Sequence, residues 1–257
     1  MKQLRVCIAG VTGWIGRPLA EAIAELDDLD LVAAIARQAA GTRVGEVTIS
    51  GSVAEAIQTP FDVFVDYTSA DSVKPNVLAA IAARRHVVVG SSGLSDDDYA
   101  EIDRSARKQG VGVVAVGNFA ISAALLLRFA AEAAKFMPTW EIIDIAHDSK
   151  VDAPSGTARE VAWRLSQIGR PRFAVPIEDT VGMAETRGAE VSGSRIHSLR
   201  LPGHVISVEV LFGREDERLS IRYEGGTGAA PYIGGTLLAI RRVGEFKGVV
   251  RGMDKLL

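Results

Sequence analysis

Three glycines spaced three residues apart follow a short apolar run near the N-terminus and constrain the fold more than any other feature. Residues 4–9 are typical of a buried strand, Gly10, Gly13 and Gly16 come next, and apolar positions over 14–26 recur at helical spacing. In such a unit the first glycine permits a tight turn, the second lets a pyrophosphate approach the backbone, and the third lets helix and strand pack closely. The pattern predicts a dinucleotide-binding unit, with an ordinary glycine turn as the alternative.

Strands and helices continue to alternate through the first half of the chain. Near-continuous Val, Ile and Ala runs are expected of parallel strands that are covered on both faces. Their alternation with helical segments predicts an open, doubly wound α/β sheet of the Rossmann type. The expected strands are residues 29–36, 61–66, 86–90 and 111–116, and the expected helices are residues 74–85 and 96–109.

The pattern changes after residue 120 and predicts a second, α+β domain with a mixed or antiparallel sheet. Three strand-like segments alternate and carry exposed charges, which is typical of antiparallel strands with one solvated face. Residues 170–194 show no clear pattern and are predicted to form a long loop. The expected helices are residues 121–136, 158–168 and 233–243, and the expected strands are residues 140–146, 195–200, 205–212 and 218–223.

Composition narrows the classes of partner. The 257 residues carry a net charge of −3, and no long run of one sign points to nucleic acid or to an anionic membrane surface. Cys7 is the single cysteine and lies in an apolar run, so neither a disulfide nor a metal site is expected. With no signal peptide and no apolar stretch of membrane-spanning length, a cytoplasmic protein is expected.

The residues after the second predicted strand bear on the choice of dinucleotide. A carboxylate there would bind the ribose 2′-hydroxyl and favour NADH. This chain has Ala36 followed by Arg37, whose guanidinium can bind a 2′-phosphate. NADPH is therefore predicted and NADH remains possible, while a solvated surface arginine is the alternative.

Further cofactor contacts are predicted at the turns that follow the strands, because ligands bind at the carboxyl ends of strands in open α/β sheets. The Trp14 ring lies inside the glycine loop, where it could shield the adenine or the pyrophosphate. Ordinary βα turns are the alternative. The predicted contacts are Thr12, Trp14 and Ile15 in the glycine loop, Thr68 after residues 61–66, and Gly90, Ser91 and Ser92 after the following strand.

The segment from His147 to Thr157 combines cationic side chains with a turn of small residues. His147 and Lys150 leave the end of a predicted strand together, and Ser155, Gly156 and Thr157 open the next helix. N–H groups at a helix start form a nest for an anion, and a cation beside them suits a carboxylate-bearing substrate. A solvated lysine and a simple Ser or Thr N-cap are the alternatives.

Over almost its whole length the chain resembles the dihydrodipicolinate reductase (4-hydroxy-tetrahydrodipicolinate reductase) family. The string Lys-Val-Asp-Ala-Pro-Ser-Gly-Thr-Ala at residues 150–158 is its most specific part. The glycine loop belongs to the resemblance too. The other matching segments are residues 66–68, 90–93, 118–119, 196–200 and 253–256.

The resemblance implies a Rossmann domain of residues 1–119 and 233–257 and an inserted domain of residues 120–232, which binds substrate and forms a homotetramer through its sheet. It implies the NAD(P)H-dependent reduction of a cyclic unsaturated dicarboxylate, 4-hydroxy-tetrahydrodipicolinate, to tetrahydrodipicolinate in lysine and diaminopimelate biosynthesis. It assigns a substrate carboxylate to Lys150, Gly156 and Thr157, and the nicotinamide pocket to Gly90, Ser91, Ser92, Asn118 and Phe119.

The substrate half departs from the family at several positions. Family members carry two adjacent histidines before this lysine, the first being the proposed general acid, whereas this chain has Ala146 and keeps only His147. Consecutive strand residues point to opposite faces, so His147 can serve only if the strand has already ended. Residues 120–124, 206–208 and 225–228 also lose polar or basic groups of the family. Losing one general acid typically costs about 10²–10⁴-fold in rate.

These departures leave three hypotheses. The first is a reductase with the family's activity, in which Lys150, His147 or water supplies the proton. The second is an NADPH-dependent imine or ketone reductase of the same fold with a different substrate. The third is a cofactor-binding sensor without chemistry, against which the retained Lys150 and Thr157 argue.

Overall fold

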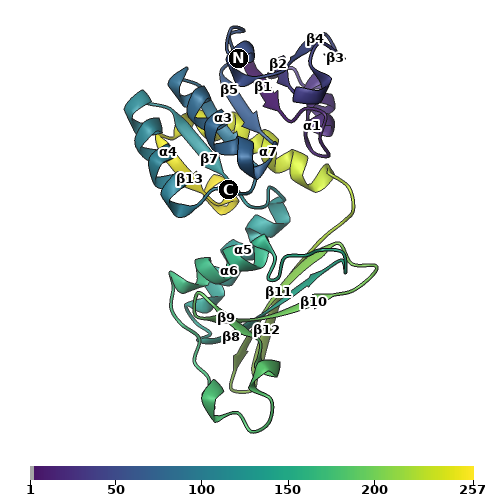
Figure 1. Ribbon diagram of the computed structural model, residues 1–257. Helices are drawn as coiled ribbons and strands as arrows, with labels where there is room; N and C mark the ends of the chain where they lie inside the picture. The colour runs from purple at the N-terminus through teal and green to yellow at the C-terminus, as the bar shows by residue number, and fades with distance from the viewer. Residues whose placement is uncertain (1–2) are drawn as a thin grey trace. The chain divides into compact units, whose positions relative to one another are not determined.

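The computed structural model describes residues 3–257, which fold as two compact units. The first unit consists of the chain up to Phe119 together with Ala229–Leu257, and the second is Ala120–Gly228. In Figure 1 the yellow C-terminal segment lies among the purple and blue elements of the first unit. The chain returns to this unit at residue 229 rather than 233, because helix α7 (Ala230–Arg242) starts early, with Pro231 in its first turn.

An eight-stranded sheet forms the centre of the first unit. Its strands are β1 (Leu4–Ala9), β2 (Leu29–Ile35), β3 (Arg43–Val44), β4 (Val47–Ser50), β5 (Val63–Asp66), β6 (His86–Val89), β7 (Gly112–Ala115) and β13 (Gly248–Arg251). Their order is β13-β7-β6-β5-β1-β2-β4-β3, and only β3 runs antiparallel to its neighbour. The chain builds outward from β1 to β4 and then returns to build β5, β6 and β7 on the other side. β1 and β5 therefore flank the topological switch point, where ligands bind in such sheets.

Helices cover both faces of this sheet. Cys7 and Ala9 of β1 face a core shared with α2 (Val53–Ala56), α3 (Ala70–Ala82) and α4 (Asp96–Gln109). The alternate strand residues are buried as well, and α1 (Gly16–Ala24) packs against α7. The predicted doubly wound fold is confirmed. The short elements β3, β4, α2 and β13 were not predicted.

A mixed five-stranded sheet forms the second unit, with the order β12-β11-β8-β10-β9. Its strands are β8 (Thr139–Ala146), β9 (Ala189–Val191), β10 (Ser194–Arg200), β11 (Ile206–Arg214) and β12 (Glu217–Gly225). The predicted mixed sheet is confirmed: β10 runs antiparallel to β9 but parallel to β8, so the expectation of antiparallel pairing is wrong only for the β10–β8 pair. The long connection between them makes the crossover that a parallel pair needs. This connection, predicted to be a loop, contains β9 and two 3₁₀ turns.

Two helices, α5 (Ile121–Ala134) and α6 (Gly156–Ser166), cover one face of the second sheet. Burial alternates strictly along β8, so Trp140, Ile142 and Ala146 face these helices while Ile143 and Ile145 lie on the open face. Within residues 3–257, no helix is both long and apolar enough to cross a membrane.

Candidate active site

The glycine loop turns at the carboxyl end of β1, beside the loop that follows β5. Gly10 has a φ of +83°, and a Cβ there would lie 2.1 Å from the Tyr67 carbonyl oxygen, so no other residue fits. A Cβ on Gly16 would lie 2.1 Å from the Gly10 carbonyl oxygen, because α1 packs directly on the turn. Around Gly13 a Cβ would meet only backbone oxygens, at 3.1 and 4.0 Å, and this exposed residue lines a hollow.

This hollow, of about 510 Å³, lies at the switch point of the sheet. It brings together five of the predicted cofactor residues, namely Gly10, Thr12, Gly13, Arg37 and Thr68. Arg37 opens a 3₁₀ turn, η1 (Arg37–Ala39), directly after β2. A polar hollow at a glycine turn fits the phosphate and ribose groups of a dinucleotide. Sequence reasoning missed the polar lining residues Gln38, Ser52, Ser72 and Asn76. Gln38 and Ser52 follow β2 and β4, whereas Ser72 and Asn76 lie in the first two turns of α3.

A buried carboxylate joins the loops that follow β5 and β6. Asp66 Oδ1 accepts hydrogen bonds from the Thr68 N–H (3.1 Å), the Thr68 hydroxyl (2.7 Å) and the Ser91 hydroxyl (2.6 Å). Its Oδ2 accepts from the Asn76 side-chain amide at 3.0 Å. Thr68 and Ser91, both predicted cofactor contacts, thus direct their hydroxyls to Asp66. These hydrogen bonds fix the two loops relative to each other, and no local pattern in the sequence indicates this network.

An aromatic cluster supports the remaining predicted cofactor residues. A Cβ on Gly90 would lie 2.1 Å from Cε1 of Tyr67, so the ring packs directly on this turn. The Phe119 ring lies edge-on to Tyr67 at 6.0 Å, and the Tyr67 hydroxyl lies 2.6 Å from Oγ1 of Thr236. Burial raises the pKa of Tyr67 above its usual value. Four predicted cofactor residues lie outside this aromatic cluster. Trp14 is 58% exposed, and its ring lies edge-on to Tyr232 at 5.5 Å. Ile15 stands at the start of α1, Ser92 is exposed and Asn118 is buried.

In the second unit, β8 ends at Ala146, so His147 already belongs to the following loop. The Ala146 side chain is fully buried and has no acidic proton to donate. The His147 ring is half exposed, with Nδ1 2.7 Å from the Ser149 hydroxyl and 2.9 Å from the Asp148 carboxylate. The structural condition under which His147 could act is met, although these contacts keep Nδ1 within its own loop.

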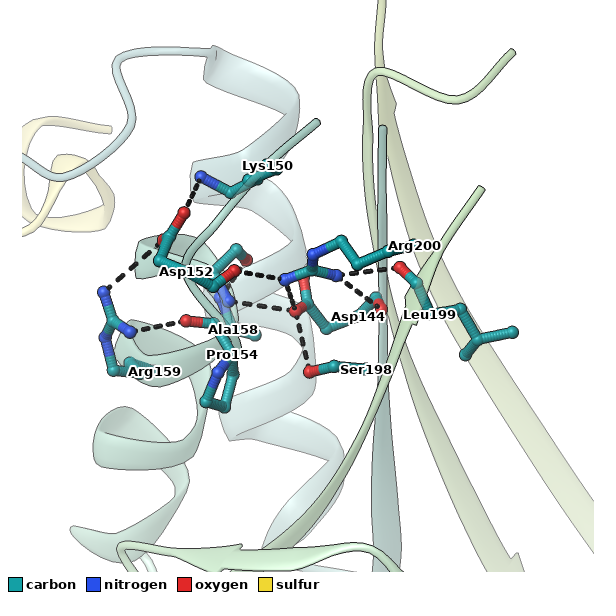
Figure 2. Close-up of polar contacts among 10 residues, drawn as sticks. Asp144, Lys150, Asp152, Pro154, Ala158, Arg159, Ser198, Leu199 and Arg200 are labelled. Atoms are coloured by element: carbon teal, nitrogen blue, oxygen red, sulfur yellow. Dashed lines mark hydrogen bonds and ion pairs between the residues drawn. The ribbon is translucent and has the colours of Figure 1, made fainter. Parts of the chain in front are cut away.

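Lys150 and the start of α6 flank the same loop (Figure 2). Lys150 Nζ lies 2.6 Å from Asp152 Oδ1, and this contact holds the pKa of the Asp152 carboxyl below its usual value. Ser155 is the N-cap, because its hydroxyl accepts a hydrogen bond from the Ala158 N–H at 3.2 Å. Its side chain is buried and shapes the loop, as the alternative of a simple N-cap anticipated. Beside Gly156 a Cβ would meet nothing within 4 Å, and Thr157 is buried.

The first unit has the fold of a dinucleotide-binding oxidoreductase, with a glycine turn and a polar hollow at the switch point of a parallel sheet. The inserted unit carries Lys150 at one end of a short loop and the start of α6 at the other. Among residues 3–257 no three His, Cys, Asp or Glu side chains form a metal-binding group. The family model described as dihydrodipicolinate reductase, N-terminus, matches residues 4–119, and that described as its C-terminus matches 122–257. The chain belongs to the dihydrodipicolinate reductase family, which confirms the predicted resemblance.

Individual relatives match this chain over its full length. The chain is 36% identical to the 4-hydroxy-tetrahydrodipicolinate reductase of Desulfitobacterium hafniense, with all of both chains covered. It is 35% identical to that of Synechococcus elongatus, with 98% of each chain covered. A dihydrodipicolinate reductase of Paenisporosarcina sp. TG-14, solved with dipicolinate bound, superposes with a TM-score of 0.87 at 28% identity, over 99% of this chain and all of that one. An amine dehydrogenase of Mycobacterium smegmatis shares the fold, with a TM-score of 0.68 at 15% identity over 96% of this chain and 94% of that one.

Proposed function

We propose that this chain reduces 4-hydroxy-tetrahydrodipicolinate to tetrahydrodipicolinate with NADPH, in lysine and diaminopimelate biosynthesis. The full-length relatives carry this activity in their names. The observation that carries the proposal is the loop from Lys150 to Thr157, which has a cation at one end and the start of α6 at the other, in a chain of this family. The relatives named above at 28% identity or more do not favour the alternative of an imine or ketone reductase, nor that of a sensor.

The groups of the second unit bind and orient a dicarboxylate. The Lys150 ammonium and the N–H groups of Gly156 and Thr157 hold one substrate carboxylate through charge-assisted hydrogen bonds. The same positive groups draw electron density from the reacting double bond and stabilise charge that develops during reduction. Lys150 and His147 are the candidate proton donors, since the Ala146 methyl group has no acidic proton. The nicotinamide, when bound, supplies the hydride.

The first unit holds the reductant. The hollow beside the glycine loop takes the phosphates and the adenosine ribose, and the Arg37 guanidinium takes the 2′-phosphate of NADPH. The loops joined by Asp66 and the turn around Gly90 line the nicotinamide end, together with Asn118 and Phe119. The Trp14 ring shields the bound dinucleotide.

The decisive experiment measures NADPH oxidation with the condensation product of pyruvate and aspartate semialdehyde. We expect turnover in the parent chain and its loss in Lys150→Met, while NADPH still binds both proteins. Because the Paenisporosarcina relative was solved with dipicolinate, we expect dipicolinate to bind here too and to compete with substrate. Background-level oxidation in the parent chain overturns the proposal, and a panel of cyclic imines and keto acids then tests the alternative reductase.

We further infer a homotetramer formed through the open face of the second sheet. Ile143, Leu199 and Leu211 leave apolar surface on that face, and Leu199 and Leu211 are each 40% exposed. Light scattering after size-exclusion chromatography tests this inference, and a monomer at micromolar concentration contradicts it. A cytoplasmic location stays a prediction from the sequence.

A further inference from the structure

A carboxylate lies on the buried face of β8, among the apolar residues that pack against α5 and α6. Asp144 has no exposed surface, and its Oδ2 accepts hydrogen bonds from the Ser198 hydroxyl (3.0 Å) and the Ser155 N–H (2.9 Å). Arg200 Nη2 completes the set at 2.9 Å (Figure 2). Burial acts to raise the pKa of Asp144, but the hydrogen bonds and the Arg200 charge outweigh it and hold the pKa below its usual value. Asp144 is therefore a buried anion.

Arg200 distributes its donors over several segments instead of pairing both nitrogens with one carboxylate. Nη2 also donates to the Asp152 carbonyl oxygen at 2.7 Å, and Nη1 donates to the Leu199 carbonyl oxygen at 2.8 Å. Within the described residues, Asp144 Oδ1 and Arg200 Nε are buried without a hydrogen-bond partner. A pair that served stability alone would use the stronger bidentate geometry, and buried ion pairs add little net stability in any case. Arg200 therefore joins β8 to the segment around Asp152.

The connected segments are the two ends of the substrate loop, which we define as residues 150–156. At one end, Arg200 binds the carbonyl of Asp152, whose carboxylate pairs with Lys150 at 2.6 Å. At the other end, Asp144 binds the N–H of Ser155, the residue that caps α6 immediately before Gly156. A single buried ion pair thus fixes both the lysine and the helix start.

We propose that Arg200, acting through Asp144, is a positioning residue that sets the distance between Lys150 and the N–H groups at the start of α6. The distance between these cationic and N–H groups determines which carboxylate fits between them, so the pair controls substrate affinity without touching substrate. This inference rests on the proposed function of the substrate loop in carboxylate binding. Loss of the Arg200 hydrogen bonds to Asp144 and Asp152 should therefore raise the substrate KM and the dipicolinate Kd. It should leave the affinity for NADPH unchanged, because the cofactor hollow belongs to the other unit.

The test compares Arg200→Lys, which keeps the charge but loses the planar fork, with the double variant Asp144→Asn/Arg200→Met, which removes both buried charges together. Arg195→Lys is the matched control, since Arg195 lies on the same strand and faces the opposite side of the sheet. Measured quantities are KM and kcat, the Kd of dipicolinate and of NADPH, and amide hydrogen exchange across the substrate loop. We expect a rise of about tenfold or more in KM and in dipicolinate Kd for Arg200→Lys, in line with the loss of one charge-assisted hydrogen bond.

The outcomes separate positioning from folding. A variant that only folds less well loses kcat in proportion to its active fraction and keeps the parental KM, and that result overturns the proposal. Faster loop exchange together with a higher KM or dipicolinate Kd, both absent in Arg195→Lys, supports it. Unchanged exchange in Arg200→Lys overturns it as well. If the parent turns over no substrate, the proposed function fails, but dipicolinate affinity and loop exchange still decide whether Arg200 positions the loop.

Discussion

Alanine at Gly16 and at Gly13 should separate the glycine that packs the fold from the glycine that faces the ligand. A Cβ on Gly16 would lie 2.1 Å from the Gly10 carbonyl oxygen and 2.9 Å from the Val11 Cα. Both neighbours are backbone atoms, so α1 must move by more than roughly 1 Å to restore ordinary contact. Overpacking of this kind costs about 1–3 kcal/mol or more, whereas the better helix propensity of alanine returns at most about 1 kcal/mol.

We therefore expect Gly16→Ala to lose about 2 kcal/mol of unfolding free energy, which lowers Tm by about 4–8 °C in a chain of this size. Gly13→Ala adds its methyl group toward the hollow, where the nearest atom is a single carbonyl oxygen at 3.1 Å. We expect its Tm to stay close to the parental value, while its Kd for NADPH rises about tenfold, which corresponds to about 1.4 kcal/mol.

Thermal and urea denaturation give the stability of both variants, and titration of NADPH fluorescence gives the affinity. Gly16→Ala with the parental Tm would falsify the argument from backbone overlap. Gly13→Ala with the parental Kd for NADPH would remove the glycine loop from the cofactor site. Loss of affinity in both variants, with loss of stability only in Gly16→Ala, is the expected pattern.

Three further predictions test other parts of the molecule. Arg37→Ala should weaken NADPH binding about 10-fold or more and leave NADH binding unchanged, since only NADPH offers a 2′-phosphate. Equal losses of affinity for both dinucleotides contradict this role of Arg37. Lys150→Met should raise the dipicolinate Kd by about 10–100-fold without changing Tm, because the loss is one charge-assisted contact at a partly exposed side chain; parental affinity by calorimetry rules the lysine out. Lys74 and Ser95 lower the pKa of Asp98 from 3.8 to about 2. The Lys74–Asp98 ion pair therefore stabilises the fold above the unfolded pKa of Asp98, and that contribution is lost as the pH falls through about 2. In Lys74→Met the urea midpoint should depend less on pH over this window, and a pH dependence equal to that of the parent refutes the assignment.

Local patterns in the sequence were enough to predict the doubly wound fold of the first unit, although not its short elements β3, β4, α2 and β13. A tight turn, a close approach and a helix packed on a strand each exclude a side chain, so three glycines at fixed spacing indicate strand–turn–helix before any tertiary contact is known. Buried parallel strands likewise require apolar runs. The string at residues 150–158 also opened a helix where expected, because a cap and the first turn of a helix are set by neighbouring residues.

Tertiary structure decided the rest, because those features depend on residues that are distant along the chain. Asp66 and Ser91 are 25 positions apart, and Asp144 and Arg200 are 56 apart, so neither hydrogen-bond network leaves a local pattern. The direction of β10 depends on the path of its long connection, which strand periodicity does not record. The sequence determined where the backbone must turn tightly at the glycine loop, because side chains are excluded there. The fold determined which charges hold residues 150–156 in place, because these charges come from separate strands.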